Sequence, residues 1–479
     1  MAETQTAEIR ALLGGGTGED RVAAMHFMVG AGFLVLGGAL ALLALLSIRF
    51  ADLFPVTYGR LEPMANLTLM FGFAVISLVG GVYYVLPRLT GTRLWSADLA
   101  GSGLLGISGM VVFGLVIIGF GFGSGRQPLG LPWWFHIPML LLLALPLIIT
   151  VGTISNRVET RSFVTLWFVI GGVVWLPLLY LAYFVAEIPN LDAVAIEYSN
   201  VFLSAGFVTM FLLTVGTGLF YYTLVKELDV SLASRQLALV GFWSLGFAAA
   251  WWGAAQLIFG PAPTWVSGVA AALGLAFPIG TLANAANASL TMEGSWGDLS
   301  ERPGVSAGIY GLYLAVAIGI LAALAGFRSI AAVTSLTTFW EAIEYAAIAG
   351  PGALLIAGVT FSALPRVVGK EIASLKRARS FNRLTIIGSV GTLLFMSAAG
   401  ILSGYSWIGG SNTAAYVDAG EGWAAGLGTS FDTLMLIAIA FAFVTFVGQL
   451  AYASTIFGTV ATGKATTQEV LVAKEPADE

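Results

Sequence analysis

Long apolar stretches, separated by short polar linkers, follow one another along almost the whole chain. About twelve of them reach the ~17–25 residues that a helix needs to cross the hydrocarbon core of a bilayer. We expect spans near 22–46, 62–87, 100–122, 133–153, 162–186, 197–225, 236–259, 264–291, 305–327, 339–362, 384–404 and 431–457. The pattern therefore predicts an all-α membrane protein that crosses the bilayer about twelve times.

The composition supports a membrane protein and excludes several kinds of chemistry. Hydrophobic residues make up 58% of the chain and charged residues only 10%, whereas soluble domains carry about 25% charged residues. Because the chain has no cysteine, it can form no disulfide, thiolate metal site, iron–sulfur cluster or covalent haem attachment of its own. No basic patch alternates with aromatic residues, which argues against a nucleic-acid partner.

Lysine and arginine are distributed unequally between the linkers on the two sides of the membrane. With the N-terminus in the cytoplasm, 17 of the 21 fall on the cytoplasmic side and 4 on the other. Because positive linkers stay inside, we expect both termini in the cytoplasm and the protein in the cell's inner (cytoplasmic) membrane. We divide the chain into a cytoplasmic N-terminal segment (1–21), a twelve-helix membrane domain (22–462) and a polar cytoplasmic tail (463–479).

One expected span carries a recognisable motif. The stretch YGRLEPMANLTLMFGFAVISLVGGVYYVLPR (58–88) resembles the second helix of subunit I of cbb-type cytochrome oxidases and their nitric-oxide-reductase relatives, which belong to the haem–copper oxidase superfamily. In that family the run reads approximately GRL-x-P-L-H, and its histidine binds the low-spin haem. Here Gly, Arg, Leu and Pro within 59–63 match, the histidine position is Ala65, and Glu62 stands where relatives often carry arginine beside the haem.

A second resemblance covers the sixth and seventh helices of the family, from the Tyr-Tyr pair at 221–222 to the tryptophan at 251. Its register places the copper-binding histidine pair of the family at Ala255 and Gln256, and the preceding copper histidine at Ala205. The resemblance thus implies that all three copper positions have lost their imidazole.

Two further segments, 278–296 and 329–352, resemble the eighth and tenth helices of the family. In the family the latter segment carries the histidines of both haems. This chain has no histidine between 137 and 479. The resemblance therefore implies a subunit I bundle, N-in and C-in, that binds neither haem nor copper and has no catalytic residue of the family.

Only His26 and His136 remain as candidate imidazole ligands. They fall near opposite ends of their spans, ~20 Å or more apart along the membrane normal at 1.5 Å per residue. Metal–nitrogen bonds are about 2 Å long, so the two cannot share an ion. We expect both to be interfacial side chains.

Ionisable and amide side chains within the spans are the remaining candidates for function. Glu341 and Glu344 share one helix face because they are three residues apart, although Thr338 and Glu341 also match a capping box, the favoured interpretation of Glu341. Asn284 and Asn287 lie on one face of the eighth span, where interhelical hydrogen bonding is the simpler explanation. Together these four residues form a candidate proton or polar path.

With the cofactors gone, the centre between helices 2, 6, 7 and 10 should be filled by side chains or lipid, because an empty cavity of haem size would be destabilising. We expect an aromatic wall of Trp243, Phe247, Trp251 and Trp252 there, with Met64 as a further filler.

The sequence favours a cofactor-free membrane subunit of a larger respiratory or redox complex, as an anchor, a quinone-facing or a proton-conducting chain. A stand-alone transporter or proton channel on the same scaffold is the alternative, and an active oxygen or nitric oxide reductase is the least favoured. Catalysis by the chain itself is left open. Expected partners are membrane lipid and other subunits, with a quinone or lipid as the bound small molecule.

In the basic linker 366–383, Lys376, Arg377 and Arg379 could dock an acidic partner or simply obey the positive-inside rule.

Overall fold

The computed structural model describes residues 18–50, 54–187, 192–260, 263–411 and 423–464, apart from the side chains of 407–429. Within these ranges it contains 12 helical spans that are long and apolar enough to cross a membrane, which confirms the predicted all-α bundle. The expected segments 1–21 and 463–479 lie largely outside the described residues and stay predictions.

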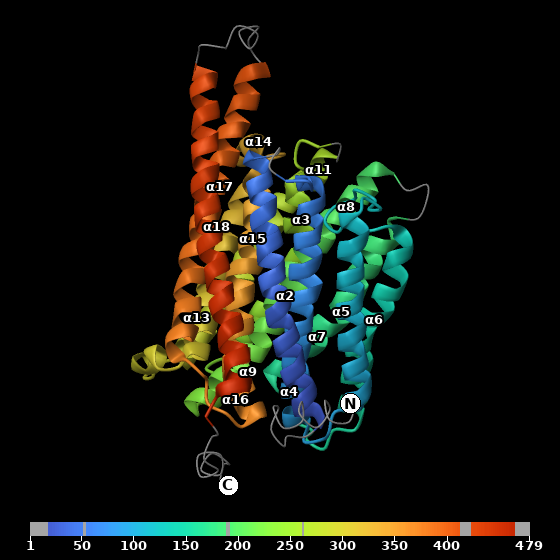
Figure 1. The fold of residues 1–479 in the computed structure, drawn as a ribbon, viewed down its shortest axis with the longest axis vertical. Coiled ribbons are helices and arrows are strands. Elements are labelled where there is room, and N and C mark those ends of the chain that lie inside the picture. The colour runs from blue at the N-terminus through green and yellow to red at the C-terminus, as the bar shows by residue number, and fades with distance from the viewer. Residues whose placement is uncertain (1–17, 51–53, 188–191, 261–262, 412–422, 465–479) are drawn as a thin grey trace.

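The spans run alternately up and down the bundle, so that the described chain begins and ends at the same end (Figure 1). We call this end, which carries most of the described lysines and arginines, the basic end. In chain order the helices are α2 (Gly18–Arg49); α3 (Tyr58–Leu67), η2 (Thr68–Val75) and α4 (Ile76–Thr90); α5 (Ala97–Gly119); α6 (Trp133–Ser155); α7 (Val164–Val185); α8 (Ala193–Gly206), η3 (Phe207–Leu213) and α9 (Thr214–Leu228); α10 (Arg235–Trp252) and η4 (Ala254–Leu257); α11 (Thr264–Leu273) and α12 (Ala276–Thr291); η5 (Trp296–Ser300); α13 (Pro303–Ala325); α14 (Arg328–Thr334); α15 (Thr338–Ala347), η6 (Ile348–Gly352) and α16 (Ala353–Val368); α17 (Leu375–Ser411); and α18 (Trp423–Thr462).

The last two helices are much longer than the predicted spans 384–404 and 431–457. They contain 37 and 40 residues, which corresponds to about 55 and 60 Å at 1.5 Å per residue, against a hydrocarbon core of about 30 Å. Figure 1 shows the pair rising clear of the bundle at the end opposite the basic end. They can pack closely because Gly388 has no side chain: a Cβ there would lie 2.5 Å from the backbone nitrogen of Thr445.

The basic linker is shorter than predicted. α16 continues to Val368 and ends at Gly369, whose left-handed φ of 64° suits a residue without a Cβ. α17 already begins at Leu375, so residues 375–383 are helical and only 369–374 connect the two helices. The predicted span began only where the polar residues end, but polar residues do not prevent a helix. The prediction was wrong because the stretch 375–383, which lacks glycine and proline, extends the helix beyond the apolar span.

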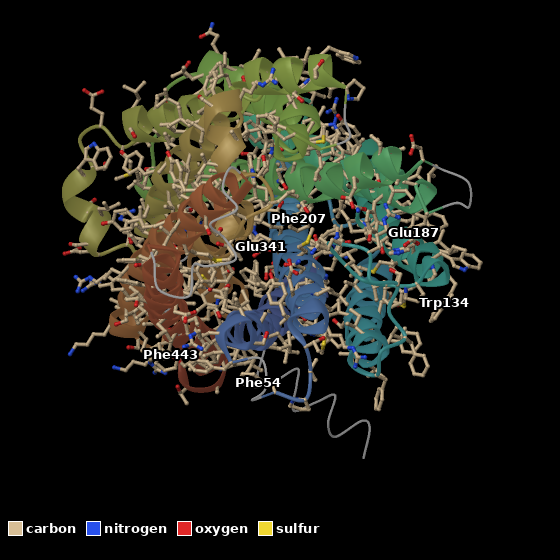
Figure 2. The ribbon with its side chains drawn as sticks, turned by 90° about the horizontal axis from the view of Figure 1, so that it is seen from above. Phe54, Trp134, Glu187, Phe207, Glu341 and Phe443 are labelled. Atoms are coloured by element: carbon tan, nitrogen blue, oxygen red, sulfur yellow. The ribbon has the colours of Figure 1, made fainter. Side chains whose placement is uncertain are left out.

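Three π-helical segments meet at the centre of the bundle. η2, η3 and η6 contact one another, and they begin within four residues after Ala65, Ala205 and Glu344, respectively. Phe71 and Phe207 are fully buried there, with ring centroids 5.9 Å apart. Figure 2 shows Phe207 in the interior of the bundle, seen along its long axis. Phenylalanines from the π-helical segments therefore pack this part of the region where the family resemblance places the cofactors. Such π-helical segments are often found at functional sites.

The aromatic residues expected to fill the centre lie elsewhere. Trp243 and Phe247 are 63% and 50% exposed on the outer face of α10, and Trp251, four residues further on, is half-buried. Trp252 is buried, but against Phe277 of α12, at 5.1 Å between ring centroids. Trp243, Phe247 and Trp251 are spaced by four residues and therefore share one face of α10. The expectation was wrong because this face is the exposed outer face and does not point to the centre of the bundle. Met64, the other expected filler, is half-buried and lies beside α5.

Candidate functional site: a carboxylate cavity beside Ala65

A small cavity lies beside the alanine at the predicted haem-ligand position, toward the end of the bundle opposite the basic end. Its volume is about 70 Å³, well below the ~300–1,000 Å³ of ordinary ligand pockets. α2, α3, η2, α15, η6 and α17 supply its wall. The lining residues are Ala41, Ala44, Leu45, Tyr58, Glu62, Ala65, Asn66, Leu69, Glu341, Glu344, Tyr345, Ile348 and Met396. The space suits a few small polar molecules or an ion, and not a macrocycle.

Three carboxylates converge on this cavity from two helices. Glu62 lies one turn after Tyr58 on α3, and Glu341 and Glu344 lie one turn apart on α15, so that each pair shares one helix face. The Tyr58 hydroxyl interacts with the carboxyl groups of Glu62 and Glu341. Glu344 Oε1 accepts a hydrogen bond of 2.9 Å from Gln256 Nε2, which comes from η4.

These carboxylates have no cationic neighbour to balance them. Across the described parts of the chain, no arginine, lysine or histidine forms an ion pair with Glu62, Glu341 or Glu344. Like charges that share an apolar site repel one another. The cavity can therefore stabilise a proton bound to one of these carboxylates.

Glu341 does not cap its helix. The N-cap of α15 is Thr337, whose side chain accepts a hydrogen bond from Phe339 N, while the Thr338 hydroxyl bonds to the carbonyl of Met396. In a capping box the acidic residue occupies the third helical position after the N-cap. Because Thr337 rather than Thr338 is the N-cap, Glu341 occupies the fourth helical position, and the capping-box interpretation was wrong. This carboxylate is thereby free to face the cavity.

The two asparagines lie far from the carboxylates. The Tyr221 hydroxyl donates to Asn284 Oδ1 at 3.0 Å, and Ser234 N donates to Asn287 Oδ1 at 2.9 Å. The first is an interhelical hydrogen bond of the kind that the sequence favoured, and the second joins α12 to the N-cap of α10. Ser234 precedes α10 and Gln256 follows it, a separation of about 22 residues or about 30 Å. The structure thus divides the four residues of the candidate path between the two ends of α10.

Both histidines are buried, contrary to the interfacial expectation. His26 is 2% exposed, and its Nδ1 lies 2.8 Å from the carbonyl oxygen of Val22. His136 is fully buried; its Nδ1 lies 2.8 Å from the Tyr180 hydroxyl and its Nε2 3.3 Å from Glu187 Oε2. The prediction was wrong because a position near the end of a span does not reveal whether a neighbouring helix covers it.

The residues at the predicted haem and copper positions do not fit these groups. Ala65, Ala205 and Ala255 are buried and offer only methyl groups, which carry no lone pair for a metal. Gln256 donates its amide hydrogen to Glu344. In the ranges that the structure describes, no group of three or more His, Cys, Asp or Glu side chains is placed to hold a metal ion. No step of haem or copper chemistry can be assigned to these positions.

Two members of the site escaped the sequence analysis. Tyr58 was not singled out, and Glu62 was noted only because relatives often carry arginine at its position. The signal was nevertheless present: Tyr58 and Glu62 are four residues apart and therefore share a helix face with each other. What the sequence could not supply was the pairing of that face with α15.

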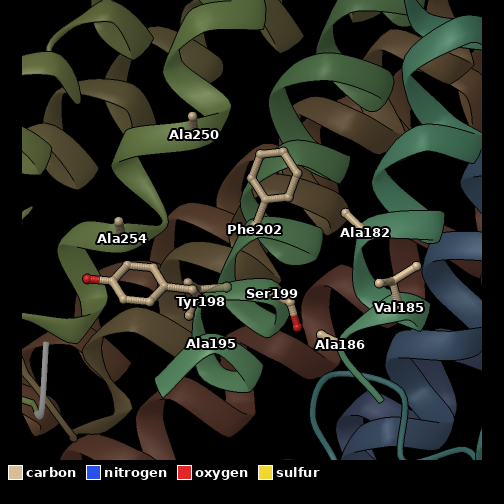
Figure 3. A pocket seen from close by; sticks show the side chains of 10 residues that line it. Ala182, Val185, Ala186, Ala195, Tyr198, Ser199, Phe202, Ala250 and Ala254 are labelled. Carbon is tan, nitrogen blue, oxygen red and sulfur yellow. The ribbon is translucent and has the colours of Figure 1, made fainter. Parts of the chain in front are cut away.

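A second cavity of about 360 Å³ lies between α7, α8 and α10. Figure 3 shows that alanines and Phe202 form most of its wall, and that the Tyr198 hydroxyl points away from Ser199. The Ser199 hydroxyl is already engaged by Arg126 Nη2 at 2.6 Å. With few polar groups converging on it, this space suits an apolar chain better than a polar headgroup.

The predicted docking residues lie in the first turns of α17. Lys376 and Arg377 are exposed, and Arg377 Nη1 donates to the carbonyl of Ser454 at 3.3 Å. Arg379 is half-buried, with its Nε buried and without a hydrogen-bond partner among the described residues. The three side chains therefore share a helix start, two of them exposed and the third half-buried.

Comparison with known proteins identifies the origin of this fold. The family model described as cytochrome c and quinol oxidase polypeptide I matches residues 21–444. Cytochrome c oxidase subunit 1 of Rhodobacter capsulatus is 26% identical over 74% of this chain and 68% of its own length. Subunit CcoN1 of the cbb3-type cytochrome c oxidase of Stutzerimonas stutzeri is 23% identical over 74% of this chain and 77% of its own.

A structural comparison agrees. The cryo-EM structure of a heme-copper terminal oxidase dimer superimposes with a TM-score of 0.75, at 12% sequence identity, over 94% of this chain and 85% of that one. The resemblance seen in the sequence and the twelve-span fold are thereby confirmed. The chain belongs to the cytochrome c and quinol oxidase polypeptide I family, that is, to the haem–copper oxidase subunit I proteins.

Proposed function

We propose that this protein is a cofactor-free subunit I homologue that serves as a membrane subunit of a larger respiratory or redox complex in the cytoplasmic membrane. The observation that supports this most strongly is the cavity beside Ala65. It has a volume of only about 70 Å³ and is lined by three carboxylates in the predicted haem-ligand region. Without ligands for haem or copper, the chain has no electron carrier of its own. Its contribution then rests on its shape and its surfaces, with the electron carriers in partner chains.

The start of α17 is the surface that we assign to a partner. Cations at a helix N-terminus oppose the helix dipole and destabilise it slightly. This helix nevertheless carries Lys376, Arg377 and Arg379 in its first turns and no acidic residue in its first turn. The positive-inside rule accounts for the sign of the charge, and docking of an acidic partner would account for its concentration at one helix start.

Neutralising this cluster should release a partner without disturbing the fold. We expect the variant Lys376→Gln, Arg377→Gln, Arg379→Gln to lose a chain that co-purifies from native membranes in mild detergent, because the attraction of three cations is removed. A matched control neutralises three exposed arginines of other linkers at the same end, Arg93, Arg157 and Arg161. Mass spectrometry of both preparations, with membrane insertion checked by fractionation, measures the effect.

The outcome is decisive for the choice of function. Loss of the partner in both variants would point to overall charge and remove the docking assignment. If the unaltered chain purifies alone from its native membrane, the subunit proposal fails.

The alternative is a stand-alone transporter or proton channel, and the carboxylate cavity is the observation that favours it. Intramembrane carboxylates mark proton and cation pathways in many proteins. Glu344 lies about two helical turns inside α15 and is the leading carrier. Proton or cation flux by the isolated chain in vesicles, abolished by Glu344→Gln, would bring this alternative to first place.

For the bound small molecule, the cavity in Figure 3 supports a lipid over a quinone. A quinone headgroup needs hydrogen-bond donors at its two carbonyl oxygens, and the lining consists mainly of alanine, valine and Phe202. A lipid chain needs none.

A further inference from the structure

The largest of the cavities described here lies at the basic end and belongs to none of the sites above. Its volume is about 610 Å³, within the usual range of ligand pockets. Its wall is formed by the last turns of α4 and α9, the first turn of α7 and the linkers before α7 and α10. The lining residues are Arg88, Leu89, Gly91, Glu159, Ser162, Phe163, Val164, Thr165, Tyr221, Tyr222, Val225, Lys226, Ser231 and Leu232. Because it sits among the ends of membrane-spanning helices, where the polar headgroups flank the hydrocarbon core, a lipid headgroup could reach this cavity.

The polar groups of this cavity differ in how far they are already engaged. Arg88 is held in place: it donates to Asp20 Oδ1 at 2.9 Å and to the Tyr84 carbonyl at 2.8 Å, and its guanidinium lies 4.1 Å from the Tyr84 ring centroid. The side chains of Lys226 and Tyr222, by contrast, make no hydrogen bond or ion pair with any described residue. The cavity thus offers an ammonium and a hydroxyl that are unused within the described chain.

The rest of the wall is divided by polarity. Leu89, Val164 and Val225 give it an apolar side, which can take the start of an acyl chain. Glu159 is the only acidic residue in the lining, and its Oε1 accepts a hydrogen bond of 2.8 Å from Arg161 N. A ligand for this space therefore combines one anionic group with an apolar body.

We propose that this cavity binds the phosphate headgroup of an anionic membrane lipid, with Lys226 as its principal cation, Tyr222 as a second donor and the fixed Arg88 as a longer-range positive charge. Basic pockets between transmembrane helices on one side of a bilayer bind such headgroups. A free phosphate ion would share the polar contacts but would leave the apolar side unused. The proposal stands independently of the function proposed above.

The test measures lipid binding to the delipidated full chain in detergent by native mass spectrometry. Phosphatidylglycerol should bind more tightly than phosphatidylcholine. Lys226→Gln should weaken the binding of phosphatidylglycerol at least about fivefold, as expected for one basic side chain near the headgroup, and Lys226→Arg should retain it. Lys464→Gln is the matched control: Lys464 is exposed just after α18, so the substitution makes the same charge change at the same end, outside the cavity lining, with no expected effect.

Three results would overturn the proposal. Equal binding of the zwitterionic and the anionic lipid would show that the apolar wall alone selects the ligand. An equal effect of Lys226→Gln and Lys464→Gln would show that only overall charge matters. Displacement of phosphatidylglycerol by millimolar inorganic phosphate would assign the cavity to a free anion. Retention by Lys226→Arg alongside loss in Lys226→Gln excludes a folding defect as the cause.

Discussion

Replacing Arg126 by methionine should lower the free energy of unfolding by about 3–5 kcal/mol, because it leaves a buried carboxylate without its cation. The Arg126 side chain is 10% exposed and that of Glu187 9%, with Nη1 and Oε1 3.5 Å apart. The Arg126 guanidinium also lies 4.0 Å from the Tyr183 ring centroid, and its Nε donates to Asn200 Oδ1 at 2.7 Å. The substitution therefore breaks contacts that join the linker after α5 to α7 and α8.

Arg49 provides the matched control for this prediction. It forms an ion pair with Asp432 at 3.3 Å, but the two side chains are 38% and 44% exposed, so Arg49→Met should cost less than ~1 kcal/mol. Unfolding in detergent, followed by tryptophan fluorescence against denaturant, compares the two variants. Equal losses of unfolding free energy in Arg126→Met and Arg49→Met would contradict the view that burial makes the contacts of Arg126 important.

The phenylalanine Phe207 should be similarly sensitive. It is fully buried in η3 and packs against Phe71 and Phe211 with tilted rings, at 5.9 and 5.6 Å between ring centroids. Phe207→Ala should cost about 3–5 kcal/mol, because it removes a large side chain and leaves a cavity in the centre of the bundle.

Phe443 is the corresponding control because it is 53% exposed on α18, and Figure 2 shows it at the periphery. Phe443→Ala opens no internal cavity and should change stability by less than ~0.5 kcal/mol. If both phenylalanine variants unfold at the same denaturant concentration, the π-helical centre is not tightly packed and the account of the filled cofactor region is wrong.

The spans were predictable because each is a long apolar stretch, and the bilayer allows few other structures for such stretches. Their ends were less predictable. α17 begins nine residues before the predicted span at 384, because its polar first turns stay helical outside the membrane. The short helix α14 went unnoticed because seven residues, Arg328–Thr334, are too few for a periodic pattern to stand out.

The candidate site was predicted only in part. Glu344 and Gln256 were singled out from the sequence, and they are hydrogen-bonded to each other. Their partners Tyr58 and Glu62 were missed, and Asn284 and Asn287 were grouped with the carboxylates although they lie at the other end of α10. Periodicity shows which residues share a face of one helix, but the facing of two helices depends on packing that a single sequence does not display.

The haem content of the purified protein tests the central claim most directly. The chain should be isolated from its native membrane, without added cofactor, and assayed as the pyridine haemochrome against protein concentration. Because Ala65 stands at the predicted low-spin haem-ligand position and no histidine lies between 137 and 479, we expect no stoichiometric haem. A spectrum that corresponds to one or more haems per chain, after removal of every co-purifying haem protein, would contradict the account.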